Sequence, residues 1–268
     1  MAGREPIFEP TKGGGHMETR GRRVHAIEKS IQLLDCFWLA RRPLSLSELE
    51  KRTGWAKSTI HGLLASMLDS GVVEQNPGDG KYHLGYHLFE LGSAVNQSWD
   101  VPNLCRPHLQ HLVDCFNESV YLARLSGDDL LLAICEEPHT SFRITSEVGT
   151  RLPLHCSSQG KAILANRSRY EADRLLRRAP LEVMTPHTVT DPDRLLDSLA
   201  AIRAQGYAEE HEEYKLGLQS VAAPIFSRDG ACSYAIGVIC MTTVPREAFD
   251  AVRVAVVQTA NAISSDLR

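Results

Sequence analysis

The sequence predicts an α+β protein of two domains, and three observations support that fold class. Residues 24–85 give the order helix, short helix, tight turn, helix and β-hairpin, which is typical of a winged helix-turn-helix. Residues 86–97 continue as one further amphipathic helix. Beyond it, strand-like apolar alternations are interleaved with helical patterns, which indicates an antiparallel sheet flanked by helices.

Composition limits the class of protein and its compartment. The 268 residues are enough for two domains of ordinary size, and 43% of them are hydrophobic. No apolar run approaches the roughly 18 residues that a membrane span needs, and the N-terminus has no apolar signal-peptide core. Seven cysteines, an odd number without a Cys-x-x-Cys pair, argue against a disulfide framework. We therefore expect a cytoplasmic protein.

The N-terminal part of the chain differs from the rest in origin and in charge. Residues 1–16 contain Gly-Gly-Gly-His and look like an expression tag and linker, so we expect the native chain to start at Met17. Residues 18–97 carry 10 Lys and Arg against 9 Asp and Glu, whereas residues 98–268 carry 17 against 22. This mild positive bias favours a nucleic-acid partner only slightly.

Local patterns justify each element of the predicted DNA-binding domain, residues 17–85. Apolar residues at helical spacing predict helices over residues 24–40 and 57–71, and a short helix between them has Ser47 as its N-cap. Strands within residues 72–85 flank an Asn-Pro-Gly-Asp-Gly turn. The apolar positions of the two long helices are Val24, Ile27, Ile31, Leu34, Phe37, Trp38, Ile60, Leu63, Leu64, Met67 and Leu68.

The start of the third helix carries the chemistry that suits DNA. Lys57, Ser58 and Thr59 occupy its first turn, where free N–H groups and the helix dipole favour phosphate. Any one of these residues could instead simply cap and solubilise a surface helix, but the five-element pattern as a whole predicts double-stranded DNA as partner. The candidate DNA-binding residues are Arg22, Arg23, Ser47, Lys57, Ser58, Thr59, His61 and Lys81.

Residues 86–98 form the predicted linker helix, and residues 99–268 form the second domain. The linker has a narrow stripe of Leu88, Leu91 and Val95, which suggests pairing with a partner. The patterns of the second domain are a helix over 104–117, a hairpin over 119–137, strand-like alternation over 141–154, a capping box from Ser168 to Glu171, a helix from Asp191 to Gly206, a strand pair turning at 228–230, and a terminal helix with Pro245 in its first turn.

The segment Leu152 to Ala165 places His, Cys, Ser and Lys close together, which raises the question of chemistry. A phosphate loop requires Gly-x-x-x-x-Gly-Lys-Ser/Thr, and His155 and Ala162 break that pattern. Cys156 has no suitable base, because the side chain of His155 would point to the opposite face of a strand. The His and Cys residues lack metal-ligand spacing. We expect no catalytic residue, metal or cofactor; what remains is a helix N-terminus that can receive an anionic ligand.

Several spaced motifs now give a specific resemblance. The segments "LSLSELEKRTGWAKSTIHGLLASMLDSGVVEQ", "GKYHLG", "GTRLPLHCSSQGKAILA" and "GYAEEHEEYKLGLQSVAAPIF" occur in the order seen in the IclR family of bacterial transcriptional regulators. The chain resembles that family from Val24 to Leu267. The resemblance implies a GAF-like effector-binding fold for the second domain. It also implies that Gly62 replaces an Arg that looks like a DNA-contacting residue in relatives.

The resemblance also implies where the effector binds. In the family the segment that matches Ser157 to Gly160 lines the effector pocket, and Ser158 and Gln159 would contribute backbone contacts. Gly237 and Ile239 stand where relatives that bind small oxoacids have Ser, so we expect a larger or less polar effector, such as an aromatic acid. They could instead be plain sheet packing. The candidate effector-binding residues are Ser157, Ser158, Gln159, Gly160, Glu210, Ser220, Gly237 and Ile239.

These observations predict a ligand-responsive DNA-binding transcriptional regulator, repressor or activator, of a catabolic operon. A homodimer would bind a palindromic operator, and the resemblance alone implies further pairing into a dimer of dimers. Two alternatives stay open. One is an enzyme or carrier whose helix-turn-helix is an interaction module, and the other is a constitutive DNA-binding protein without an effector.

Overall fold

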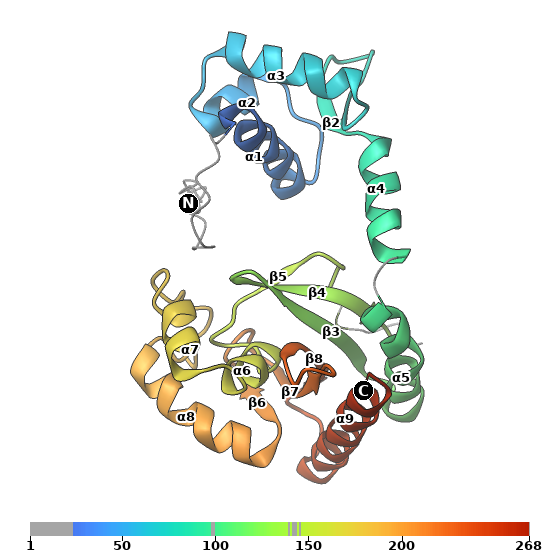
Figure 1. Ribbon diagram of the computed structural model, residues 1–268, viewed down its shortest axis with the longest axis vertical. Helices are drawn as coiled ribbons and strands as arrows, with labels where there is room; N and C mark the ends of the chain where they lie inside the picture. Colours follow the sequence, from blue (N-terminus) through green and yellow to red (C-terminus); the bar gives the residue numbers. More distant parts are fainter. Residues whose placement is uncertain (1–23, 98–99, 139, 141–143, 145, 268) are drawn as a thin grey trace. The chain divides into compact units, whose positions relative to one another are not determined.

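The computed structural model describes residues 24–97, 100–138, 140, 144 and 146–267 (Figure 1). The predicted tag, Arg22 and Arg23 therefore lie outside the described residues. The chain divides into two compact units, residues 1–99 and residues 100–268.

The N-terminal unit has the element order that the sequence predicts. Its elements are α1 (His25–Ala40), α2 (Leu46–Thr53), α3 (Lys57–Asp69), β1 (Val73–Gln75), β2 (Tyr82–Leu84) and α4 (Tyr86–Gln97). The first three helices and the antiparallel β1–β2 hairpin enclose one core, in which Leu33, Phe37, Leu49, Ile60 and Leu64 are fully or almost fully buried. The prediction that Ile60, Leu64 and Met67 of α3 face inward is confirmed.

Two local predictions for this unit are wrong. The N-cap of α2 is Ser45, not Ser47: Ser45 forms a capping box with Glu48, whereas the same spacing from Ser47 to Glu50 made the two serines equivalent in the sequence. Its hydroxyl and backbone N–H both donate to Glu48, and these hydrogen bonds lower the pKa of Glu48 to about 2. Ser47 is exposed on the helix.

The apolar stripe used to predict α1 is mostly on its outer face. Val24, Ile27 and Ile31 are more than half exposed, whereas Leu33, Cys36 and Phe37 supply the buried face. The helix is therefore apolar on two sides, and the spacing of apolar residues alone does not show which side meets the core.

The C-terminal unit is a six-stranded antiparallel sheet with strand order β5-β4-β3-β8-β7-β6. Its helices are α5 (Asp100–Phe116), α6 (Ser158–Ala165), α7 (Arg169–Leu176), α8 (Pro192–Gln205) and α9 (Arg246–Asp266). Its strands are β3 (Ser119–Ser126), β4 (Asp129–Glu136), β5 (Arg151–Leu152), β6 (Ala208–His211), β7 (Leu218–Phe226) and β8 (Cys232–Met241).

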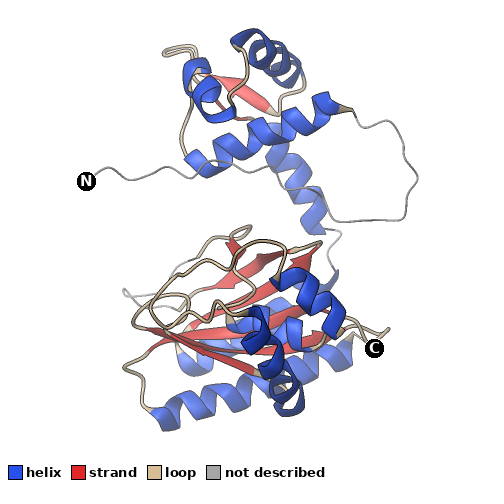
Figure 2. Cartoon of the chain, turned by 90° about the vertical axis from the view of Figure 1, so that its left-hand side faces the viewer, coloured by secondary structure: helices blue, strands red, loops and turns tan. Residues whose placement is uncertain are grey.

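Helices cover both faces of this sheet. In Figure 1, α5 and α9 lie on one side of the strands and α6, α7 and α8 on the other, and Figure 2 shows helices on both sides of the sheet. Because side chains alternate along a strand, β7 and β8 contribute one row to each face. Gly237 pairs with Ala222 and with Tyr121, so these three residues share the face covered by α6.

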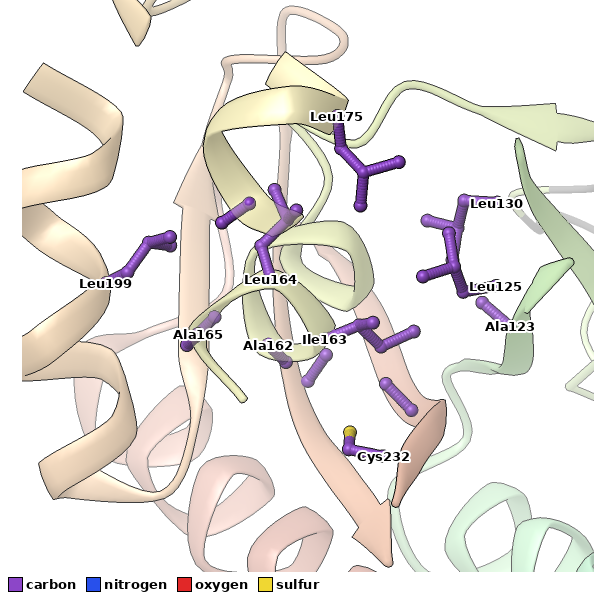
Figure 3. Packing of buried hydrophobic residues seen from close by; sticks show 14 of the residues in the cluster. Ala123, Leu125, Leu130, Ala162, Ile163, Leu164, Ala165, Leu175, Leu199 and Cys232 are labelled. Atoms are coloured by element: carbon purple, nitrogen blue, oxygen red, sulfur yellow. The ribbon is translucent and has the colours of Figure 1, made fainter. Parts of the chain in front are cut away.

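Helix α6 lies at the centre of its layer. All eight of its residues are buried, and Figure 3 shows Ala162, Ile163 and Leu164 among residues from β3, β8 and α8. The facing sheet positions are small, with Ala123, Ala222 and Ala235 fully buried. Small residues on both partners let the helix approach the sheet closely, which fixes the position of its N-terminus.

The structure also differs from the predicted elements of this unit. Strand-like alternation over residues 141–154 yields only β5, and the other described residues of that segment form no regular strand. The sequence does not indicate β6, because Glu209 and Glu210 give this segment the polar character of a loop. Pro245 is the N-cap of α9 rather than a residue of its first turn.

Candidate nucleic-acid interface and ligand site

The first turn of α3 is open to an anion. Its N-cap is Ala56, which offers no side-chain hydrogen bond, and no acidic residue lies in the first turn. The N–H groups of Lys57 and Ser58 have no acceptor among the described residues. Lys57, Ser58 and Thr59 are exposed. The helix thus presents free N–H donors, two hydroxyls and one ammonium group at its positive end.

The outer face of α3 continues this surface. His61 is exposed one turn after Ser58, on the flank of the stripe formed by buried Ile60 and Leu64. Gly62 is also exposed, and a Cβ built there would meet no atom within 4 Å. Gly62 therefore leaves open space on the helix and no packing defect.

Two of the predicted DNA contacts, Lys57 and Lys81, each lie beside a carboxylate. Lys57 lies 3.5 Å from Glu50, and Lys81 on the β1–β2 turn lies 3.5 Å from Asp79; all four side chains are at least two-fifths exposed. Such exposed pairs are weak and exchange readily for phosphate.

The second candidate site is the N-terminus of α6. Ser157 is the N-cap, and its hydroxyl accepts the N–H of Gly160 at 3.2 Å while donating to the carbonyl of Pro153. Gly160 therefore has no N–H to offer a ligand. The N–H groups of Ser158 and Gln159 have no acceptor among the described residues, so these two are the backbone donors that remain.

Three of the predicted residues form one buried hydrogen-bond chain. The hydroxyls of Ser158 and Ser220 lie 2.8 Å apart, and Ser220 donates to Glu210 at 3.0 Å. The other carboxylate oxygen of Glu210 accepts the N–H groups of Glu213 and Tyr214. Burial raises the pKa of Glu210, and these hydrogen bonds oppose that effect. Donors of the chain itself thus occupy both carboxylate oxygens of Glu210. The carboxylate in turn holds the Ser220 side chain and the loop that contains Glu213 and Tyr214.

Gln159 is the unusual residue of this site. It is only 2% exposed, and its Nε2 donors have no partner in the described part of the chain. Buried amide groups are almost always hydrogen-bonded, so an exception calls for an explanation. A Cβ at position 237 would lie 2.6 Å from Gln159 Nε2, which is closer than such atoms approach. Gly237 is what allows the Gln159 amide to lie against the sheet.

The sheet brings the remaining predicted residue to the same place. Ile239 is half-buried and pairs with Ser220 on one side and with Ser119 on the other. Neither Ser119 nor Tyr121 was predicted as a site residue, yet both donate their hydroxyls to the carbonyl of Ile144, at 2.8 and 2.6 Å. Their register opposite Ile239 and Gly237 was the only available signal, and it required the strand order.

Sequence reasoning also missed a buried ion pair beside the site. Lys161 and Glu213 form it, with side chains 8% and 15% exposed. Glu213 Oε2 has no partner among the described residues. The two residues lie 52 positions apart in the sequence, and nothing in either local pattern indicates the contact.

The geometry does not support catalysis by Cys156. His155 and Cys156 lie in a turn rather than on the strand we assumed. Cys156 is fully buried, and burial raises the pKa of its thiol to about 12, so the nucleophilic thiolate does not form near neutral pH. His155 Nε2 lies 3.0 Å from the carbonyl of Glu182. No group of three or more potential metal ligands is present among the described residues.

No helix in the described part of the chain is both long and apolar enough to cross a bilayer.

Comparison with known proteins covers both units. Residues 26–77 match the IclR helix-turn-helix domain, and residues 93–265 match the bacterial transcriptional regulator IclR C-terminal domain. The HTH-type transcriptional regulator BhcR of Paracoccus denitrificans is 34% identical over 80% of this chain and 77% of its own length. The transcriptional repressor IclR of Escherichia coli is 32% identical over 76% of this chain and 75% of its own.

A solved structure extends the similarity to the fold. An IclR homologue from Microbacterium hydrocarbonoxydans, complexed with 4-hydroxybenzoate, covers 91% of this chain and 99% of its own, with 27% identity and a TM-score of 0.77. These matches are to regulators and confirm that interpretation rather than the alternative of an enzyme or carrier. The chain belongs to the IclR family of bacterial transcriptional regulators.

Proposed function

We propose that this regulator senses a small organic acid at the N-terminus of α6, and that the bound acid changes how a homodimer holds a palindromic operator. The observation that carries the proposal is the buried Gln159 amide nitrogen, which has no partner among the described residues, beside two free backbone N–H groups. In this proposal residues 17–85 bind DNA in the cytoplasm, residues 86–98 connect the two domains, and residues 99–268 bind the effector.

The DNA contact rests on α3. Lys57, Ser58 and Thr59 would hold phosphate at the helix N-terminus, while Ser58 and His61 would face base edges in the major groove. Lys81 would contact phosphate from the wing, and Arg22 and Arg23 would extend the basic surface before α1. Ser47, on the exposed side of α2, would contact the backbone.

A DNA titration tests this contact. Lys57→Ala should weaken binding to the promoter fragment beside the protein's own gene and reduce the slope of log Kd against log salt by about 1, because one phosphate contact is lost. Fluorescence anisotropy between 50 and 200 mM salt measures both quantities. Lys215→Ala, which removes an exposed lysine of the other unit, is the matched control. Identical affinity and slope for both variants would refute the placement of α3 on DNA.

The homodimer rests on two exposed apolar stripes in the N-terminal unit. Val24, Ile27 and Ile31 line the outer face of α1. Tyr86 and Phe89 of α4 are each nearly two-thirds exposed, with ring centroids 5.4 Å apart. Exposed apolar side chains in such rows are typical of interfaces. A second copy would cover them, and its two-fold symmetry would set two recognition helices about one DNA turn, roughly 34 Å, apart.

The ligand class follows from the donors at α6. Two backbone N–H groups at the positive end of a helix, with the Gln159 amide, suit a carboxylate or another acceptor-rich group. Because Gly237 and Ile239 offer no hydroxyl, the rest of the ligand would meet the apolar side chain of Ile239. That arrangement favours an aromatic or other weakly polar acid from a catabolic pathway, and the similarity to a 4-hydroxybenzoate complex supports it.

Gln159→Leu tests the ligand site by two readouts that a structural role cannot produce together. The ligand-free C-terminal unit should keep its stability, because an unpaired buried amide nitrogen is removed and the Ser158 hydroxyl, which loses Gln159 Oε1 as an acceptor, keeps Ser220 as a partner. Affinity for 4-hydroxybenzoate, or for the best-bound acid of a carboxylate panel, should fall about tenfold or more because hydrogen bonds to a charged group are lost. Gln110→Leu, at a half-buried position of α5 outside this site, is the control. A less stable variant that binds the acid with native affinity would contradict the assignment.

A further inference from the structure

A hollow lies at the C-terminal end of α6, opposite the end that carries Gln159. It has a volume of about 230 Å³ and is bounded by the C-terminus of α6, by α7 and by α8. Its floor is apolar, with Leu164 of α6 and Leu199 of α8 both labelled in Figure 3. Three arginines, Arg167, Arg169 and Arg203, line it as well. The other lining residues are Ala165, Ala172, Leu196 and Ala200.

Arg203 is held rigidly at this hollow. Its Nε donates to the carbonyl of Ala165 at 2.5 Å, and its Nη2 donates to the carbonyl of Arg167 at 2.6 Å. These bonds offset the negative end of the α6 dipole. They also fix the position of the guanidinium. Both acceptors are backbone carbonyls, and no carboxylate among the described residues pairs with this positive charge. A fixed guanidinium loses little further entropy when it binds a carboxylate.

Arg167 also keeps unused donor capacity. Its Nη2 donates to Ser233 Oγ at 3.3 Å, while its Nε is buried with no partner in the described part of the chain. Arg169 forms a solvent-exposed ion pair with Asp197 at 3.2 Å, and this is the one carboxylate paired with the three arginines among the described residues. The hollow therefore carries more positive charge than its own carboxylates balance.

We propose that this hollow is a second binding site, for a small organic carboxylate. Its carboxylate would bind Arg167 and Arg203, and its apolar body would rest on Leu164, Leu196 and Leu199. The volume is below the roughly 300 Å³ at which drug-sized pockets begin, so a nucleotide is too large. The proposal rests on residues of α6, α7, α8 and the α6–α7 connection other than those of the Gln159 site, and it stands or falls separately from the proposed function.

The test uses the full chain carrying Gln159→Leu, so that the benzoate binding measured is that of the second site. Isothermal titration with benzoate should give one bound ligand per chain at constant ionic strength. Arg167→Leu should lower that affinity at least tenfold, since charge-assisted hydrogen bonds are lost. Ala200→Phe should do the same by filling the hollow from an exposed position on α8 while leaving all three arginines in place.

Two controls make the result decisive. Arg194→Leu removes an exposed arginine of α8 that does not line the hollow, and it should leave benzoate binding unchanged. Inorganic phosphate should bind more weakly than benzoate, because it has no apolar body. Any of three results would overturn the proposal. The Gln159→Leu chain does not bind benzoate, its benzoate affinity is unchanged by both Arg167→Leu and Ala200→Phe, or it binds phosphate as tightly as benzoate. Equal stoichiometry in the native and Gln159→Leu chains would instead count against the first site.

Discussion

Gly160→Ala should destabilise the C-terminal unit by about 3 kcal/mol, the upper end of the usual cost of overpacking. A Cβ at this position would lie 2.4 Å from the carbonyl oxygen of Leu154 and 2.7 Å from the Cα of Leu154. Both are backbone atoms, which cannot rotate away as a side chain can. The helix would have to move off its N-cap Ser157, whose Oγ would also lie only 2.7 Å from the new Cβ.

Gly62→Ala is the matched control for this substitution. Gly62 also lies in a helix, but its Cβ would meet open space, so alanine should stabilise α3 by about 1 kcal/mol. Trp38 and Trp55 lie in the N-terminal unit, so with Trp99 replaced by Phe in both variants the tryptophan fluorescence reports on that unit. Urea unfolding followed by circular dichroism and by fluorescence should separate the two effects. Similar stability losses in both variants would show that the close approach of α6 to Leu154 is absent.

Lys161→Met should have the next largest effect, a loss of about 3–5 kcal/mol from the C-terminal unit. The substitution leaves the Glu213 carboxylate mostly buried beside the α6 site without its cation. Met preserves the length and the apolar stem of Lys161, so the lost charge, rather than a cavity, dominates the change. Urea unfolding followed by circular dichroism measures it.

The double variant Lys161→Met with Glu213→Leu separates the pair from its surroundings. Replacing both partners of a buried ion pair by apolar residues of similar size is often neutral, so the double variant should recover most of the lost stability. Arg169→Met, which breaks a solvent-exposed ion pair with Asp197, should cost less than about 1 kcal/mol. Additive losses from the two single substitutions would mean that Lys161 and Glu213 do not interact in solution.

The sequence predicted most elements because their signals are local. The capping box at Ser168, the Asp191 N-cap and the Gly206 end of α8 each depend on residues within one or two turns. The failures arose where tertiary context decides. The helical spacing of Val24, Ile27 and Ile31 is the same for a core face and for an exposed face. Strand β6 carries a buried Glu210 where a typical strand would carry an apolar residue.

The candidate ligand site was predictable as a helix N-terminus but not in its details. Small and polar residues between Ser157 and Gly160 indicated the turn directly. The contact of Gln159 with Gly237 joins residues far apart in the sequence, and it depends on where α6 crosses β8. Lys161 and Glu213 are also far apart in the sequence, so no local pattern indicates their ion pair. No local pattern indicates the hollow at the C-terminal end of α6 either. The first of these features depends on the packing of α6 against the sheet, and the hollow depends on its packing beside α7 and α8.

The most direct test of ligand-controlled DNA binding combines a selection with a titration. Selection from a random double-stranded DNA library with the native chain should enrich a two-fold symmetric sequence. An organic acid that the native chain binds and Gln159→Leu does not should change the Kd for that DNA by about 5–150-fold, the usual range of allosteric coupling. Gln159→Leu should bind the same DNA with a Kd that the acid leaves unchanged. Failure to enrich any sequence, or a native Kd that stays constant when the acid saturates the α6 site, would contradict the central claim.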